Sequence, residues 1–180
     1  MFKKSLLKLS SPLTVSTAAM MIAVYVAFYA IKLPIALESR MSLTFLPLML
    51  AAYLLGPVPA MIVGAVGDIL SFVFFPNGQY FPGFTLSAIL SGLIYGLLLY
   101  HKSGEIRGRV IAAVAMVVFF VNMCLNTLWL SILYNKAFIV FLGTRVFLNL
   151  IEFPVMILLG IIILDMTKKT GIIKKYITEN

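Results

Sequence analysis

The residues best suited to chemistry form a short stretch, Gly67 to Tyr80, in which a single carboxylate, Asp68, stands inside an otherwise apolar segment. The segment leads into an aromatic loop that carries the turn signal Asn77-Gly78. A carboxylate is costly to bury in lipid, so an acid at such a position indicates function before it indicates structure. Asp68 is therefore the first candidate binding residue.

The elements that position Asp68 belong to a membrane protein. Of the 180 residues 62% are hydrophobic and 11% are charged, and the mean hydropathy is +1.09, which excludes a soluble domain. We expect residues 1–180 to form a single transmembrane substrate-binding domain, an all-α bundle of six helices. Breaks at glycine, proline and charge place these helices at residues 12–33, 41–55, 58–75, 83–100, 109–134 and 138–165. The second is short and contains Pro47, so we expect it to be tilted, kinked or partly outside the bilayer centre.

The basic residues predict the orientation. Six crossings put both termini on one side, where ten Lys and Arg residues lie against four on the other, so both termini are expected in the cytoplasm of a multi-pass cell-membrane protein. The net charge of +8 is then a topology signal and an attraction to lipid headgroups. Nucleic acid is excluded as a partner because no soluble basic face exists to bind it.

Four unusual side chains share one layer of this bundle. At about 1.5 Å per residue, Asp68 and Asn126 each lie about 12 Å below the outer ends of their helices. Arg145 lies about 10 Å down, and Trp129 is one turn nearer the surface than Asn126. An acid, a base, an amide and a large aromatic at one depth predict an outward-facing pocket for a polar aromatic ligand.

Structural roles are the alternative for each of these residues. Asp68 and Arg145 would pair as a salt bridge that fixes helix register, and Asn126 would bond a neighbouring helix. Trp129 would anchor the chain at the headgroup boundary. Glu152, two residues before Pro154, would either line the lower pocket or satisfy groups that the proline frees.

Two loops are expected over the pocket. The first, Pro34 to Arg40, brings Arg40 and the nearby Lys32 to the rim, where they would hold a carboxylate. The second, Pro76 to Gly83, contains Tyr80, whose ring would stack on a flat heterocycle. Ordinary polar connectors are the alternative.

At this point the motifs resemble those of the folate-specific substrate-binding subunits of energy-coupling factor (ECF) transporters. The similarity covers nearly the whole chain and is carried by residues 68–70, 76–88, 92–96 and 126–129 together with Arg145. Its most specific piece is the run Tyr-Phe-Pro-Gly-Phe-Thr-Leu at residues 80–86.

The resemblance implies a subunit that captures folate outside the cell and delivers it inside. It would dock with a transmembrane coupling (T) component and two cytoplasmic ABC-type ATPases. In this reading Asp68 and Asn126 bond the aminopyrimidine edge of the pterin, and Trp129 and Tyr80 stack on it. Arg145 supplies a charge in the pocket, and Arg40 with Lys32 meets the glutamate carboxylates, although Arg145 and Arg40 are interchangeable in these roles.

Ala19, Ala23 and Ala27 recur every four residues on the first helix and form a smooth stripe. The family uses such residues to contact the coupling subunit; packing within the bundle is the alternative. Gly92 and Gly96 form a second stripe, which we assign to packing inside the bundle.

Catalysis is not expected. The sequence contains no Gly-x-x-x-x-Gly-Lys-Ser/Thr loop, and its one histidine, His101, is far from Cys124 and from the acids. We therefore predict no catalytic residues, no metal and no cofactor. The remaining alternatives are an ECF subunit for another vitamin, such as thiamine or riboflavin, and a structural membrane protein without a ligand.

Overall fold

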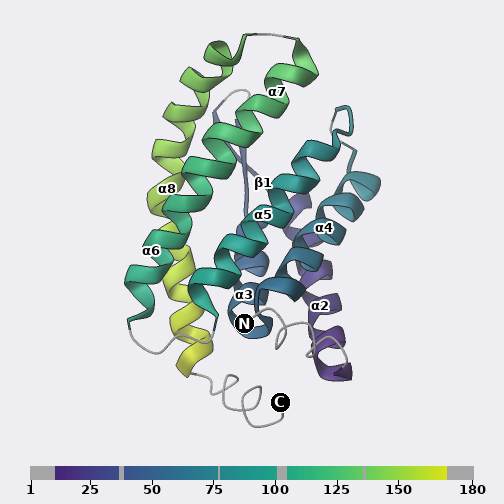
Figure 1. Ribbon diagram of the computed structural model, residues 1–180, viewed down its shortest axis with the longest axis vertical. Coiled ribbons are helices and arrows are strands. Elements are labelled where there is room, and N and C mark those ends of the chain that lie inside the picture. The colour runs from purple at the N-terminus through teal and green to yellow at the C-terminus, as the bar shows by residue number, and fades with distance from the viewer. Residues whose placement is uncertain (1–10, 37–38, 77, 101–104, 136, 170–180) are drawn as a thin grey trace.

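The computed structural model describes residues 11–36, 39–76, 78–100, 105–135 and 137–169, with the side chains of residues 32–36, 39–42 and 140 left out of the description. Its helices form one bundle (Figure 1). They are α2 (Pro12–Ala30), α3 (Phe45–Leu55), α4 (Pro57–Phe74), α5 (Pro82–Leu99), α6 (Ile106–Met116) continued by the π-helical segment η1 (Val117–Leu125) and α7 (Asn126–Tyr134), and α8 (Phe138–Lys169).

The predicted bundle of six membrane helices is confirmed. Five helices of the described chain are long and apolar enough to cross a bilayer, the fifth of them being the continuous run Ile106–Tyr134. The sixth, α3, has 11 residues and reaches about 16 Å, roughly half of a hydrocarbon core of about 30 Å. The cytoplasmic location of the termini stays a prediction.

The short helix α3 forms the centre of the bundle. Met49, Ala51 and Ala52 are fully buried, and α3 contacts α2, α4, α5 and α8. A helix surrounded by other helices meets no lipid, so it needs neither the length nor the apolar surface of a spanning helix. Gly56, whose φ is 99°, then reverses the chain into Pro57 of α4 without a further linking residue.

Glycines let α4 and α5 pack with their backbones in contact. A Cβ built on Gly92 would lie 2.6 Å from the carbonyl oxygen of Ala60, and one on Gly64 would lie 2.7 Å from that of Ala88. Gly96 lies equally close to Pro57. The assignment of Gly92 and Gly96 to packing inside the bundle is thus confirmed.

A small β-hairpin was not predicted. Strands β1 (Lys32–Ala36) and β2 (Ser39–Ser42) are antiparallel, with Lys32 opposite Ser42 and Pro34 opposite Arg40. The first helix therefore ends at Ala30 rather than at residue 33, and α3 begins at Phe45 rather than at residue 41. The prediction erred because residues 32–33 and 41–42 were assigned to the flanking helices and the segment between them to a loop over the pocket.

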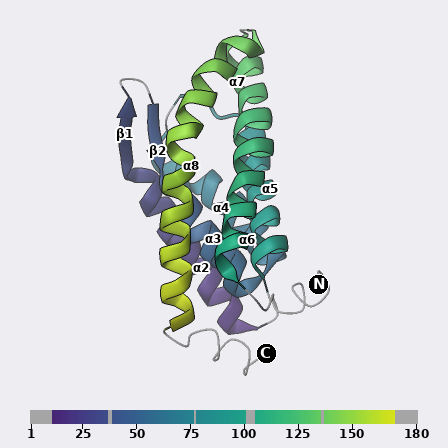
Figure 2. The same cartoon turned by 90° about the vertical axis from the view of Figure 1, so that its left-hand side faces the viewer.

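The bundle has two distinct ends. Helix α2 begins and α8 ends at the lower end in Figure 1, which we name the terminal end. The hairpin, the α4–α5 loop and the α7–α8 turn lie at the opposite end, which we name the loop end, as Figure 2 shows from the side. In the α4–α5 loop Gly78 has a φ of 86°, as the predicted turn requires, whereas Asn77 lies outside the described residues.

Replacement of Gly92 tests the close packing of α4 and α5. Gly92→Ala is expected to lower the melting temperature of the detergent-solubilised protein, because overpacking a tight core costs about 1–3 kcal/mol. Gly143→Ala is the control, since nothing lies within 4 Å of its added Cβ and alanine favours a helix. Equal melting temperatures for the two variants would contradict the packing argument.

Candidate functional site

A cavity of about 260 Å³ lies inside the bundle, and each of the six membrane helices contributes to its wall. The wall combines aromatic and aliphatic side chains with two acids, a base and several amides and hydroxyls. Its residues are Tyr25, Thr44, Phe45, Leu48, Asp68, Phe84, Ser87, Ala88, Ser91, Tyr95, Val117, Val121, Asn122, Asn126, Arg145, Glu152 and Met156. An apolar enclosure with a few converging polar groups is the usual form of a small-molecule site.

Asp68 is held by a chain of hydroxyl groups. It stands on α4, six residues before the helix ends, and its Oδ2 accepts a hydrogen bond of 2.7 Å from Thr85 Oγ1 on α5. The Tyr80 hydroxyl lies 2.9 Å from the same Thr85 oxygen. A carboxylate oxygen binds up to two donors, so Asp68 retains acceptor positions toward the cavity.

Three asparagines form a second chain. Asn126 Nδ2 donates to Asn122 Oδ1 over 3.2 Å, and Asn122 Nδ2 donates to Asn149 Oδ1 on α8 over 3.5 Å. Asn122 belongs to η1, and π-helical segments often occur at functional sites. Asn126 Oδ1 is buried without a partner among the described residues, so it can accept a hydrogen bond from a ligand.

Arg145 and Glu152 line the cavity from α8. They stand seven residues apart, which is about 10 Å along the helix. The alternative of a salt bridge between Asp68 and Arg145 is not found in the described part of the chain. Arg145 interacts electrostatically with Glu152 without forming a salt bridge among the described residues, so the guanidinium keeps hydrogen-bond donors for an anionic group in the cavity.

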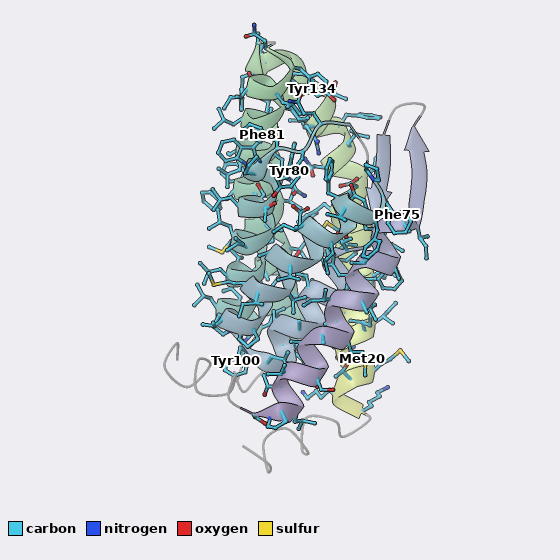
Figure 3. All side chains as sticks on the ribbon, turned by 90° about the vertical axis from the view of Figure 1, so that its right-hand side faces the viewer. Met20, Phe75, Tyr80, Phe81, Tyr100 and Tyr134 are labelled. Carbon is cyan, nitrogen blue, oxygen red and sulfur yellow. The ribbon has the colours of Figure 1, made fainter. Side chains whose placement is uncertain are left out.

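Trp129 supports the wall from behind. Its Nε1 donates to Ser87 Oγ over 3.1 Å, and its ring lies 5.7 Å from that of Phe81, centroid to centroid. A Cβ on Gly83 would lie 2.5 Å from both rings, so only glycine leaves room for them. In Figure 3, Tyr80 and Phe81 lie side by side near the loop end, opposite Tyr100 and Met20.

The inner wall carries an orphaned hydroxyl. Tyr95 is 1% exposed, and its OH has no hydrogen-bond partner among the described residues. Tyr95 lies eight residues, or about 12 Å, deeper on α5 than Ser87. The polar groups of the cavity thus extend well below the layer that the sequence predicted.

The predicted site residues fall into three groups. Asp68, Asn126 and Arg145 line the cavity. Tyr80 and Trp129 do not line it: Trp129 donates to Ser87, which does, and Tyr80 is bonded to Thr85 beside the wall. Lys32 and Arg40 lie in β1 and β2, and their side chains are outside the description.

Sequence reasoning missed several wall residues. Asn122 had a usable signal, because an amide four residues before Asn126 lies on nearly the same face of a helix. Ser87 and Ser91 in the wall had none, and neither had Thr85 beside it, since hydroxyls are common in membrane helices and carry no charge. Among the described residues no cluster of three metal-ligating side chains occurs.

The alanine stripe faces away from the bundle. Ala19, Ala23 and Ala27 are all exposed on α2. The alternative that they pack inside the bundle is therefore wrong.

Comparison with known proteins agrees with this architecture. A family model described as "ECF-type riboflavin transporter, S component" matches residues 9–169. The folate transporter FolT of Clostridium novyi is 41% identical over 132 residues, which is 73% of this chain and 74% of that one. FolT of Streptococcus mutans is 27% identical over 92% of each chain. A crystal structure of FolT bound with folic acid, 35% identical, superposes with a TM-score of 0.73 over 83% of this chain and 92% of its own.

The membrane-capable helices and the family match together identify a multi-pass subunit of a cell-membrane transporter. The chain belongs to the family of S components of ECF-type transporters. The resemblance that the motifs predicted is confirmed.

Trp129 is the single tryptophan of the chain, so its fluorescence reports on this wall. Gly83→Ala is expected to displace the indole, break its bond to Ser87 and shift the emission maximum of the purified protein. Gly143→Ala, in open space, should leave the spectrum unchanged. An unshifted spectrum for Gly83→Ala would show that the indole is not packed on α5.

Proposed function

We propose that this chain binds folate in the described cavity and delivers it to the cytoplasm as the S component of an ECF-type importer. The observation that carries the proposal is the convergence of Asp68, Asn126 and Arg145, from three different helices, on one cavity in a chain of this family. The FolT relatives and the folic acid complex of FolT support folate as the ligand.

The pterin edge matches the acceptors of the wall. Its aminopyrimidine presents neighbouring N–H groups, and Asp68 with the unpartnered Oδ1 of Asn126 offers oxygens to receive them. Phe84, Phe45 and Tyr25 add aromatic surface for a flat ring. Tyr80 and Trp129, proposed from the sequence to stack on the pterin, belong to the site as residues that hold its wall.

The charge of the ligand separates the candidate vitamins. Folate is an anion, riboflavin has no net charge and thiamine is a cation. Arg145 has no ion-pair partner among the described residues, and a guanidinium away from water gains most from a carboxylate. The Arg145 guanidinium therefore favours folate over riboflavin, whereas the acids Asp68 and Glu152 on the same wall would attract the cation thiamine.

The glutamate tail of folate is assigned to the rim. Lys32 and Arg40 belong to the hairpin at the loop end, and with both termini in the cytoplasm that end would face the exterior (Figure 2). Two cations there would attract a dianionic tail and would increase its association rate. Arg145 remains the alternative partner of the tail.

Delivery requires partners, because the sequence has no phosphate-binding loop. We assign the coupling surface to Ala19, Ala23 and Ala27, which are exposed on α2 and let another helix approach closely. A transmembrane coupling (T) component would dock there, and two cytoplasmic ABC-type ATPases would drive the subunit to topple and release folate inside.

Riboflavin is the second candidate because the matching family model carries its name. Titration of the purified protein with folic acid and with riboflavin decides between them. We expect saturable binding of folic acid and at least tenfold weaker binding of riboflavin; the reverse order would overturn the proposal.

Removal of Asp68 and Arg145, two of the three charged wall residues, tests the pocket. Asp68→Ala and Arg145→Ala are each expected to weaken folic acid binding roughly 10- to 100-fold, because a hydrogen bond to a charged group contributes about 1.5–3 kcal/mol. Isothermal titration in detergent measures both affinities. Glu105→Ala, an exposed acid at the terminal end, is the control. Unchanged affinity in both wall variants would exclude this cavity as the folate site.

A bulky residue in the alanine stripe should separate transport from binding. Ala23→Trp is expected to abolish folate uptake by cells that supply the coupling subunit and ATPases, while folic acid affinity changes less than about twofold, because the wall of the cavity is untouched. Leu158→Trp, at a 62% exposed position of α8, should preserve uptake. Normal uptake with Ala23→Trp would place the coupling surface elsewhere.

A further inference from the structure

The hydroxyl of Thr85 behaves differently from other hydroxyls in these helices. Thr17, Ser91 and Thr167 each donate to the backbone carbonyl four residues earlier, over 2.7–2.9 Å. That is the usual local bond of a helical hydroxyl. Thr85, which is 8% exposed, instead donates across the helix interface to Asp68 Oδ2 at 2.7 Å.

The number of protons fixes the direction of the whole chain. A threonine hydroxyl has one proton, and Thr85 uses it for Asp68. The bond of 2.9 Å between Tyr80 and Thr85 must therefore run from the tyrosine OH to the threonine oxygen. The order of donation is Tyr80 to Thr85 to Asp68, from the α4–α5 loop into the cavity.

The series of hydrogen bonds from Tyr80 through Thr85 restrains the orientation of the Asp68 carboxylate. Oδ2 uses one of its acceptor positions for Thr85, which restrains the rotation of the carboxylate and leaves Oδ1 open to a ligand. The Tyr80 bond removes the rotational freedom of the Thr85 hydroxyl. The Tyr80 ring is itself held at 5.1 Å, centroid to centroid, from the ring of Phe72, one turn beyond Asp68 on α4.

We propose that Thr85 is a positioning residue for ligand recognition: its hydroxyl orients the Asp68 carboxylate toward the N–H groups of a bound heterocycle, and Tyr80 fixes that hydroxyl. The inference rests on the proposed folate-binding function. Neither Thr85 nor Tyr80 lines the cavity, so their effect on the ligand passes through Asp68. Tyr80, although 39% exposed, acts through its hydroxyl rather than its ring face.

A thermodynamic cycle with folic acid as the probe tests the proposal. Thr85→Val keeps the side-chain shape and removes the hydroxyl, and we expect folic acid affinity to fall roughly tenfold or more. Thr85→Ser restores the hydroxyl and should bind within about threefold of the unmodified protein. Tyr80→Phe should lose about two- to fivefold, and should lose almost nothing further when Thr85 is already valine.

The decisive readout is the coupling to Asp68. In an Asp68→Ala background, Thr85→Val should weaken binding by less than about twofold, because the group that it positions is gone. Thr167→Val is the matched control, since it removes a helical hydroxyl remote from the cavity and should preserve affinity. Melting temperatures of all variants without folic acid separate loss of fold from loss of recognition.

The outcomes separate this inference from the function on which it rests. No folic acid binding by the unmodified protein would reject the proposed function and the inference with it. Normal binding by the unmodified protein, weak binding by Asp68→Ala and normal binding by Thr85→Val would overturn the positioning role alone. Equal losses in Thr85→Val and Thr85→Ser, or a full loss from Thr85→Val in the Asp68→Ala background, would also overturn it, because packing would then explain the effect.

Discussion

The structure depends on one constraint: a polar side chain inside a membrane bundle must find its partner within the bundle. Asp68 accepts a hydrogen bond from Thr85, and Trp129 donates one to Ser87. Asn122 is bonded to two other amides, those of Asn126 and Asn149. These bonds join α4 to α5, α7 to α5 and η1 to α8, so the polar network fixes how the helices stand around the cavity. Asn126 and Tyr95 line the cavity, and their Oδ1 and OH have no hydrogen-bond partner in the described part of the chain, so a ligand can satisfy them.

The two halves of the bundle are built differently around this network. Backbone contacts at glycine lock α4 against α5, and the buried helix α3 fills the space beside them. Helices α7 and α8 have larger exposed side chains and no glycine in backbone contact, since nothing lies near Gly143. Asp68 therefore stands on the tightly packed half, whereas Asn126 and Arg145 stand on the other, and the cavity lies between them.

The sequence was sufficient to predict the membrane helices and the depth of the site along them, but not the direction in which each side chain points from its helix axis. Hydropathy predicted six membrane helices because lipid requires long apolar runs, and axial rise put Asp68, Asn126 and Arg145 at one depth. Trp129 stands behind the wall because a rise of 1.5 Å per residue says nothing about the direction in which a side chain points, and Tyr80, expected in a loop over the pocket, is bonded to Thr85. Thr85 and Tyr95 could not be predicted as site residues for a related reason. Neither is charged, and their roles depend on the residues that lie near them in the folded bundle. The hairpin was not predicted because its two short strands show no clear alternation of apolar and polar residues.

Two breaks in regular helix geometry lie beside the cavity. In the nine-residue segment η1, π-helical bonding replaces α-helical bonding. Thr127 Oγ1 donates a hydrogen bond of 3.4 Å to the carbonyl oxygen of Asn122, five residues earlier. On the adjacent α8, Pro154 has no N–H to give to the carbonyl four residues before it. The bond between Asn122 and Asn149 shows that these breaks lie at nearly the same level, since Pro154 is only five residues from Asn149. Both helices therefore lack regular backbone bonding at this level. Asn122, Asn126 and Glu152 line the cavity there, so its polar lining stands where the helix bonding is irregular.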